Sequence, residues 1–215
     1  MSTLLDLLAR RLASDPAQPL ITFYDDATGE RTELSVKTYA NWVSKTANLF
    51  LDELMLDPGD QLTIDLPPHW LGAVFVGGAW ACGLDLVNDA PVAVVGPDGL
   101  DSTADAVLAC ALRPFAVRFA EPLPDPILDH GVLWAGQSDV FSPTGPSDLG
   151  TPEPDDRRVI TDLDPAGVPG RDLLAGLLAG TGSLVIVANS DSSRWSAHSQ
   201  SERTTAAVRA DLPTG

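Results

Sequence analysis

The sequence predicts an α/β fold in which a mixed or mostly parallel sheet carries helices on both of its faces. Three observations predict it. Residues 61–119 alternate between strand-like and helix-like segments, and an amphipathic helical segment follows Ser35. The 215 residues are also enough to bury one sizeable core without disulfides or a metal. Helices that alternate with short strands typically cover the faces of one sheet.

The chain is predicted to begin with a helix, a hairpin and a second helix. Thr3 and Asp6 have the spacing of a capping box, and the leucines that follow fall on one helical face. Residues 20–24 and 30–34 are β-rich runs around a polar turn, which indicates a hairpin. Ser35 is expected to cap the second helix, whose apolar stripe is Tyr39, Val43, Ala47, Phe50, Leu51 and Leu54.

The middle of the chain is predicted to alternate between strands and helices. Pro58, Gly59 and Asp60 form a turn, after which apolar and polar residues alternate over 61–66. Glycine and alanine are frequent in the next helix, which should let it pack closely on a sheet. In order after the turn, we expect a strand over 61–66, a helix over 69–82, strands over 84–87 and 91–95, a helix over 104–112 and a strand over 115–119.

Proline, glycine and acidic residues then divide the chain into three regions. Residues 1–141 form the main α/β region, and residues 142–170 are expected to be a loop or linker, because such a composition buries little apolar surface. Residues 171–215 should form a short α/β segment on the same sheet, giving one domain overall. Its elements are expected at 172–178 (helix), 184–188 (strand), around 195–202 (helix, capped by Asp191) and 204–208 (strand).

Charge and cysteine content exclude several classes of function. Thirteen basic and thirty acidic residues give a formal net charge of −17, which repels phosphate backbones and anionic membrane surfaces. We therefore expect no nucleic-acid partner and no binding to an anionic membrane surface. The N-terminal residues do not resemble a secretory signal, and no suitable apolar window of about 18 residues follows, so we also expect no membrane span and a cytoplasmic location. Cys82 and Cys110 stand among small apolar residues, which indicates buried thiols in a reducing compartment rather than a disulfide.

The order of these elements resembles the N-terminal part of the AMP-binding superfamily, the adenylate-forming enzymes that include acyl-CoA synthetases. The similar stretches cover roughly residues 3–88 and read TELSVKTYANWVSKTANLFL, LDPGDQLTIDLPPHWLGAVFVGGAWACG and LDLVN. A later stretch, LLAGLLAGTGSLVIVANSDSSRWSAHSQSERTTAAV, is similar to a later segment of that family. The resemblance implies the fold of the family's N-terminal subdomain and identifies the chain as a shortened bacterial relative.

Departures from the family pattern bear on activity. The family's phosphate loop is a Ser/Thr/Gly-rich run followed by Pro-Lys-Gly, but no lysine follows Lys45 in this sequence. No tyrosine follows Tyr39, so the family's adenine-stacking Tyr-Gly-x-Thr-Glu word is missing too. Phosphoryl and acyl transfer need cations beside the developing negative charge. We therefore expect no catalytic residue and no metal site, and neither ATP, AMP nor CoA is supported as a cofactor.

The candidate ligand-binding residues fall in two places. His69 stands where a helix begins and could bind an anion with the free N–H groups there, with Trp70 beside it. The stretch 179–183 is the nearest match to a phosphate loop, although a helix C-terminal turn explains it better. The residues concerned are His69, Trp70, Gly180, Thr181, Gly182 and Ser183.

Three functional hypotheses follow. In the first, the chain is a non-catalytic relative of adenylate-forming acyl-CoA synthetases that serves as a binding or protein-partner module. In the second, a residual pocket beside the 69–82 helix binds AMP, an acyl group or CoA and supports ligase-like or simpler acyl chemistry. In the third, another chain covers remaining apolar surface, giving a homodimer or a complex with a protein partner.

Overall fold

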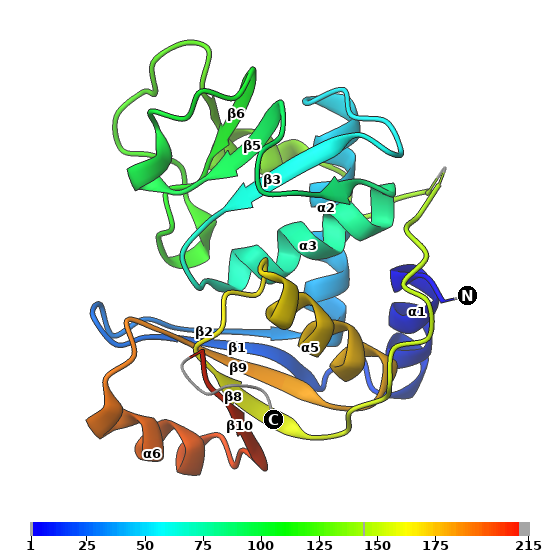
Figure 1. Cartoon of the computed structure of the whole chain (residues 1–215), viewed down its shortest axis with the longest axis vertical. Helices are drawn as coiled ribbons and strands as arrows, with labels where there is room; N and C mark the ends of the chain where they lie inside the picture. Colours follow the sequence, from blue (N-terminus) through cyan, green and yellow to red (C-terminus); the bar gives the residue numbers. More distant parts are fainter. Residues whose placement is uncertain (1, 144, 211–215) are drawn as a thin grey trace.

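The computed structural model describes residues 2–143 and 145–210 and contains two five-stranded sheets (Figure 1). The upper sheet has the order β4-β3-β5-β6-β7 and is entirely parallel. The lower sheet has the order β10-β8-β9-β1-β2 and is parallel except for the β1–β2 hairpin. Helices α2, α3 and α5 lie between the two sheets in Figure 1, and α6 lies on the far side of the lower sheet. The predicted α/β class with mostly parallel strands is confirmed, although the strands divide between two sheets.

The first half of the chain has the predicted elements. Thr3 forms the capping box with Asp6, and the Ser35 side chain accepts the Thr38 N–H at the start of α2. The turn at Gly59 leads into β3, and Gly83 ends α3 with a φ of 74°. The elements are α1 (Leu4–Ser14), β1 (Pro19–Asp25), β2 (Arg31–Ser35), α2 (Val36–Asp52), β3 (Gln61–Asp65), α3 (Trp70–Cys82), β4 (Asp85–Leu86) and β5 (Val92–Val95).

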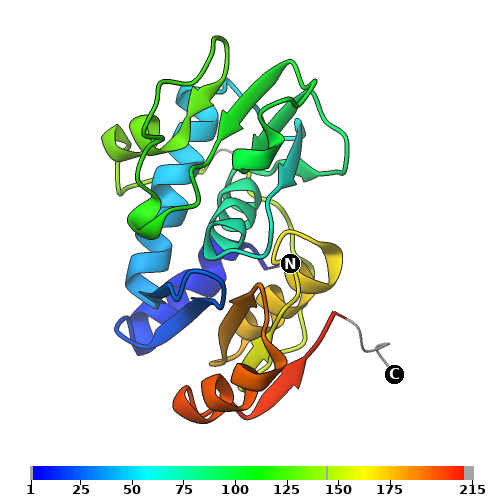
Figure 2. The same cartoon turned by 90° about the vertical axis from the view of Figure 1, so that its left-hand side faces the viewer.

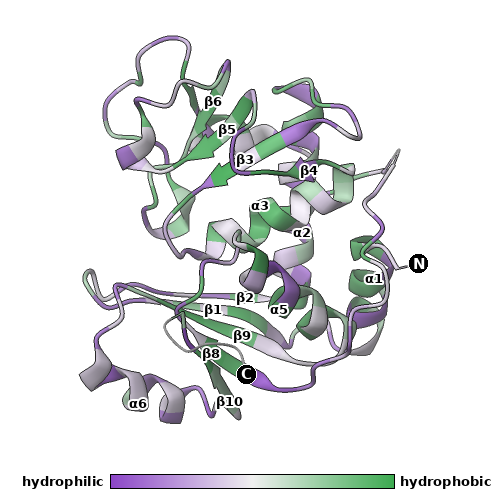
Figure 3. Ribbon diagram, in the orientation of Figure 1, coloured by the Kyte–Doolittle hydropathy of each residue, from purple (hydrophilic) through white to green (hydrophobic). Residues whose placement is uncertain are grey.

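Helix α3 is buried over its whole length because it packs between the sheets and against α2. Glycines make this close packing with α2 feasible. A Cβ atom built on Gly77 would lie 2.6 Å from the Tyr39 hydroxyl, and one built on Gly78 would lie 2.6 Å from a Thr46 methyl. Figure 2 shows α2 running alongside α3 from the hairpin toward the upper sheet. Figure 3 shows the strong hydrophobic colouring of α3 and of the central strands.

Two predictions for residues 104–119 are wrong. The expected helix over 104–112 is a strand, β6 (Ala106–Ala109), which pairs in parallel with β5. The expected strand over 115–119 is absent, and a 3-10 turn over Pro114–Ala116 takes its place. A short alanine-rich apolar run does not distinguish a helix from a strand that is buried on both faces. Leu108 belongs to the main core, and Val107 belongs to a small cluster on the opposite face of the sheet.

The expected loop over 142–170 contains a central strand. Residues 145–157 have no helix or strand, as predicted, but β8 (Arg158–Thr161) lies between β9 and β10. Helix α5 (Val168–Ala179) also begins earlier than expected. The remaining elements are β7 (Leu128–Asp129), α4 (His130–Leu133), β9 (Ser183–Ala188), α6 (Ser192–Ser201), β10 (Ala206–Val208) and 3-10 turns over Pro97–Gly99 and Trp134–Gly136.

The two sheets are covered differently on their outer faces. Helix α6, capped by Asp191 as predicted, places Trp195 against Ile160 and Val185 of the lower sheet. Loop residues such as Leu123 and Ile127 cover Val95 and Val107 of the upper sheet instead. The expectation of helices on both faces therefore holds for the lower sheet. The strands of residues 171–208 join this sheet too, because β9 pairs in parallel with β1.

Candidate functional site

The structure places the predicted site residues in separate parts of the molecule. Trp70 lines a cavity that Trp42 and Phe115 also line. Residues 181–183 line a different cavity. His69 lines neither of the two. The candidates therefore do not form one site, and each group needs its own interpretation.

His69 is buried at the N-terminus of α3 rather than exposed there. Its Nδ1 accepts the Leu71 N–H at 3.1 Å, so the proton of the neutral ring is assigned to Nε2. The ring centroid lies 4.6 Å from that of Phe23, and burial lowers the pKa of His69 to about 4. His69 itself therefore satisfies an N–H group of the helix that an external anion would need.

The turn from Gly180 to Ser183 uses its polar groups within the chain. Arg11 is 5% exposed, and its guanidinium donates to the carbonyl oxygens of Leu177, Gly180 and Gly182 at 2.8–3.1 Å. The N–H groups of Thr181, Gly182 and Ser183 donate, in that order, to the Asp156 carboxylate and the carbonyl oxygens of Asp155 and Arg157. The turn is thus closed by internal hydrogen bonds, and its N–H groups are not directed at a ligand.

A strand, a glycine-containing loop and a helix follow one another at residues 158–179, within the stretch that was expected to be a linker. Strand β8 ends at Thr161, and α5 begins after Gly167. Such strand–loop–helix junctions bind phosphate in many proteins, because the helix N-terminus presents N–H groups. A cavity of about 380 Å³ lies between this loop and the ends of β3 and β4. A buried apolar run before Gly167 and Gly170 is the sequence signal that could have located this junction.

The two aspartates of this loop already form hydrogen bonds or ion pairs with other groups of the chain. The Asp164 carboxylate accepts the Ala166 N–H at 2.9 Å, and the Asp162 carboxylate pairs with Arg209 at 2.8 Å. Burial, with a smaller contribution from nearby Asp65, raises the pKa of Asp164 above its ordinary value. Arg171 lines the cavity with the two aspartates Asp65 and Asp164. These three charged side chains sum to one negative charge, which opposes the binding of a polyphosphate.

The cavity at Trp70 has mainly aromatic and apolar walls. Its volume is about 450 Å³, and its lining includes Leu34, Trp42, Trp70, Pro114 and Phe115. The Trp42 ring meets Trp70 edge to face, with centroids 4.9 Å apart. The Trp70 Nε1 atom is buried and has no hydrogen-bond partner. This arrangement suits a small, largely apolar ligand.

Other chemically active groups are buried or scattered. Cys82 and Cys110 are both buried free thiols, as predicted, and burial raises the pKa of Cys82 to about 12. Within residues 2–143 and 145–210, no three His, Cys, Asp or Glu side chains are arranged to hold a metal ion. Across the same residues, every helix is too short or too polar to cross a lipid bilayer.

Solved structures with a similar fold include acyl-CoA synthetases. An acyl-CoA synthetase of Brucella canis matches with a TM-score of 0.75 at 12% identity, over 97% of this chain and 47% of its own. A putative long-chain-fatty-acid CoA ligase of Rhodopseudomonas palustris matches with a TM-score of 0.71 at 16% identity, over 96% of this chain and 62% of its own. This chain has an acyl-CoA synthetase fold. The fold predicted from the resemblance is therefore confirmed.

A fatty acyl CoA synthetase of Mycobacterium tuberculosis also shares the synthetase fold, with a TM-score of 0.67 at 12% identity, over 95% of this chain and 48% of its own. At such identities the likeness concerns the fold alone. The chain spans about half to two thirds of the length of these three solved structures.

A protein of Mycobacterium tuberculosis strain H37Rv, described only as a member of a numbered family, is 40% identical to this chain over 150 residues. The match covers 64% of this chain and 61% of that protein. No protein-family profile matches the sequence. This relative is therefore similar to the chain in sequence, but its description names neither a reaction nor a substrate.

Proposed function

We propose that this chain uses the synthetase fold as a non-catalytic binding module and does not form adenylates. The observation that carries the proposal is the Asp164 carboxylate, which takes a backbone N–H in the loop before α5. We regard this loop, residues 161–170, as the counterpart of the family's phosphate loop. It begins with a threonine, ends with a glycine and joins a strand to a helix, but contains two aspartates and no basic residue.

Electrostatics support this interpretation. A phosphate at the start of α5 would approach Asp164 and Asp65, and the one guanidinium that lines the cavity is that of Arg171. The Arg171 Nη1 atom already donates, at 3.4 Å, to the Leu86 carbonyl oxygen. Like charges a few ångströms apart repel strongly when they are partly buried. A nucleotide triphosphate is accordingly a poor ligand for this loop.

The position of Arg171 in the cavity lining favours a second candidate function. This function is residual binding of AMP, an acyl group or CoA. A guanidinium can hold a single phosphate by two parallel hydrogen bonds. A monophosphate brings less charge toward the two aspartates than a triphosphate does. If the chain retains nucleotide binding, AMP is therefore a better ligand than ATP, and Arg171 is the residue that would hold it.

ATP–pyrophosphate exchange with a panel of carboxylic acids tests the proposal directly, and we expect no exchange. In parallel, thermal unfolding is recorded with magnesium ATP, AMP, CoA and a stable acyl-adenylate analogue. A ligand at one hundred times its Kd would stabilise the fold by about 2.7 kcal/mol, or roughly 5–11 °C for a chain of this size. Exchange above background would contradict the non-catalytic assignment. A shift with ATP that Arg171→Met abolishes and the surface variant Arg10→Met retains would contradict the expectation that this loop binds a triphosphate poorly.

A protein partner is part of the same proposal, and the segment 115–140 is where we expect it to bind. Among the described residues, six large apolar side chains are exposed, and this segment carries Phe115, Val117, Val132 and Val140. Light scattering over a range of concentrations distinguishes self-association from binding of another protein. A dimer that Val132→Asp dissociates would identify a second copy as the partner, whereas a concentration-independent monomer would exclude the homodimer.

A further inference from the structure

The cavity lined by Trp42, Trp70 and Phe115, which we call the aromatic cavity, also borders strand β2. Successive side chains of a strand point to opposite faces. Along β2 the burial alternates, so that Thr32 and Leu34 face inward while their neighbours are more exposed. The strand therefore contributes one face to the cavity and turns the other toward the side of the sheet on which α6 lies.

Glu30 supplies a carboxylate on the inward face. It comes directly before β2, lines the aromatic cavity and is half-buried. Its Oε1 atom accepts the Thr32 hydroxyl at 2.8 Å, which places the carboxylate on the same face of the strand as Thr32. The ion pairs of residues 2–143 and 145–210 do not include Glu30. A carboxylate that is partly removed from water attracts a cation more strongly than one in open solvent.

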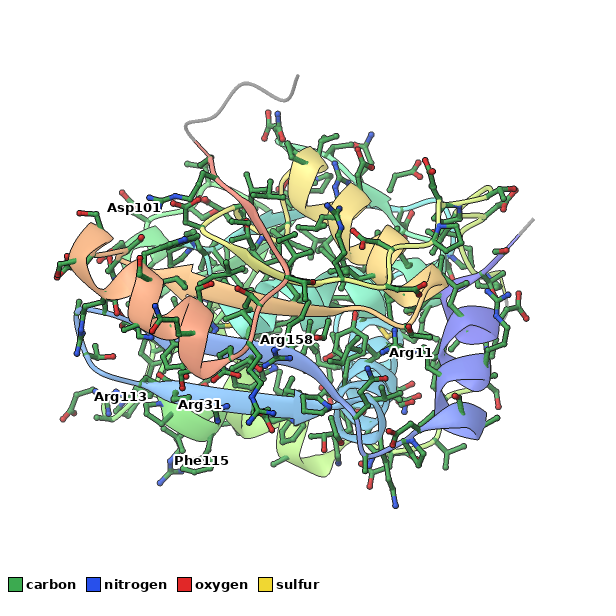
Figure 4. All side chains as sticks on the ribbon, turned by 90° about the horizontal axis from the view of Figure 1, so that it is seen from below. Arg11, Arg31, Asp101, Arg113, Phe115 and Arg158 are labelled. Atoms are coloured by element: carbon green, nitrogen blue, oxygen red, sulfur yellow. The ribbon has the colours of Figure 1, made fainter. Side chains whose placement is uncertain are left out.

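The other charges that border the aromatic cavity already form ion pairs. Arg31 pairs with Glu33 at 2.7 Å and with Glu202 at 3.0 Å. Glu202 follows α6, so this second contact lies on the outward face of β2. Arg113 lies near Phe115 in Figure 4 but does not line the cavity. Of the charged side chains that line the cavity, Glu30 is therefore the one whose charge the described residues leave unpaired.

The walls of the aromatic cavity suit the apolar body of an organic cation. Trp42 and Trp70 meet edge to face, and Leu34 and Pro114 add apolar surface. Cations bind favourably against tryptophan rings, and the net charge of −17 attracts them from a distance. A volume of about 450 Å³ is in the range that small-molecule sites occupy.

Phe115 stands at the aromatic cavity in an unusual conformation. Its side chain is 86% exposed, and its φ is 62°, a left-handed value that disfavours a large side chain. Strained residues of this kind cluster at ligand clamps. Packing of the phenyl group on the apolar body of a ligand would remove both surfaces from water.

We propose that the aromatic cavity binds a small protonated amine. Its ammonium group donates to the Glu30 carboxylate, and its apolar body packs between Trp42 and Phe115. This assignment gives the binding module a ligand class, and to that extent it rests on the proposed function. The probe is 2-phenylethylamine, which carries an ammonium group at neutral pH. Its matched controls are the uncharged 2-phenylethanol and the anionic 3-phenylpropanoate.

Titration of the whole chain, followed by ¹H–¹⁵N NMR at low ionic strength, should show saturable binding of the amine. The alcohol should bind about ten-fold more weakly, because it cannot form a charged hydrogen bond with Glu30. Glu30→Gln should weaken binding of the amine about ten-fold and remove the difference between amine and alcohol. Glu33→Gln removes the same charge from the outward face of the same strand and should change the Kd by two-fold or less.

The apolar contacts are tested in the same titration. Phe115→Ala should weaken binding of both the amine and the alcohol about five-fold, the effect of one aromatic contact. Val140→Ala, which removes another exposed apolar side chain outside the cavity lining, should leave both unchanged. The indole signal of Trp42 should shift as the amine binds, whereas that of Trp195, which lies on α6 with Arg209 over its ring, should stay in place.

Several outcomes would overturn the site. Equal losses in Glu30→Gln and Glu33→Gln would show that the net charge alone attracts the amine, and equal binding of amine and alcohol would exclude the ion pair. Tighter binding of 3-phenylpropanoate than of the amine, lost in Arg113→Ala, would identify an anion site instead. The thermal unfolding of each variant checks its folding, and if Glu30→Gln does not fold, the comparison of the three probes on wild type still decides. None of these outcomes depends on ATP–pyrophosphate exchange, so the amine site and the non-catalytic assignment fail separately.

Discussion

At each end of helix α5, a charged side chain forms hydrogen bonds with backbone groups that the helix or its neighbouring loop leaves unpaired. Asp164 accepts an N–H before the N-terminus, and Arg11 donates to carbonyl oxygens at the C-terminus. These signs also complement the helix dipole. At the start of α3, by contrast, the buried rings of His69 and Trp70 keep N–H groups without acceptors. The comparison teaches that the turn at Gly180, which looks like a binding site in the sequence, and the loop before α5 are internally satisfied, whereas the two rings at the start of α3 are not.

Of the variants that test this comparison, the largest loss of stability is expected when the Arg11 guanidinium is removed. Arg11→Met keeps the apolar stem but leaves three carbonyl oxygens without their charged donor. We expect the free energy of unfolding to fall by about 3 kcal/mol or more, which lowers Tm by roughly 6–12 °C. Urea denaturation measures this change in the free energy of unfolding. The control Arg10→Met removes the same charge from an exposed position and should change stability by less than about 0.5 kcal/mol.

Packing between α2 and α3, which positions the aromatic cavity, gives the next effect. Gly77→Ala places a methyl group 2.6 Å from the Tyr39 hydroxyl and from a Val43 methyl. It should destabilise the fold by about 1–3 kcal/mol. Gly72→Ala is the matched control, because its methyl group would lie 3.8 Å from the nearest atom, in Pro165. That variant should gain about 0.5–1 kcal/mol from helix propensity. An equal loss of stability in both variants would show that the close approach of α3 to α2 at Gly77 is not its cause.

At the loop before α5, Asp164→Asn should have a smaller effect that depends on pH. Burial raises the pKa of Asp164 in the folded state, so the folded protein holds this proton more tightly than the unfolded chain does. Stability contributed by the protonated carboxyl is present below the ordinary pKa of 3.8 and is lost as the pH rises through the raised folded value.

Asp164→Asn should therefore be more stable than wild type at pH 7 and should lose this advantage below pH 3.8, where both side chains are neutral. Urea denaturation at several pH values measures the difference, with the exposed Asp172→Asn on α5 as control. If Asp164→Asn is less stable at pH 7, the carboxylate is stabilising, and the like-charge interpretation of the loop is incorrect.

The smallest effect is expected at Phe115. Phe115→Gly should be more stable than Phe115→Ala by up to about 1 kcal/mol, because a φ of 62° disfavours any side chain with a Cβ. The comparison between the two variants removes the contribution of the phenyl group. Equal stability in urea would show that the segment relaxes out of this conformation and that the cavity mouth is not strained.

Local patterns sufficed where sequence neighbours decide the structure. Caps at Thr3, Ser35 and Asp191, the hairpin and the alternation of β3 were all predictable, because their hydrogen bonds and periodicity involve residues a few positions apart. The helix expected over 104–112 failed because pairing with β5 overrides the helix propensity of an alanine-rich run. Strand β8 was missed because its partners β9 and β10 lie more than twenty residues away.

The candidate site shows the same division. Trp70 was singled out, but Trp42 and Phe115 join it only through the packing of α2, α3 and the 3-10 turn over Pro114–Ala116. Sequence alone determined the α/β class, the helix caps and the absence of a lysine after Lys45. Tertiary structure decided which loop stands before α5, that Arg11 closes the Gly180 turn, and where ring nitrogens remain unpartnered. The physical reason is that local hydrogen bonds and periodicity are written in neighbouring residues, whereas burial and charge pairing depend on contacts between residues far apart in the chain.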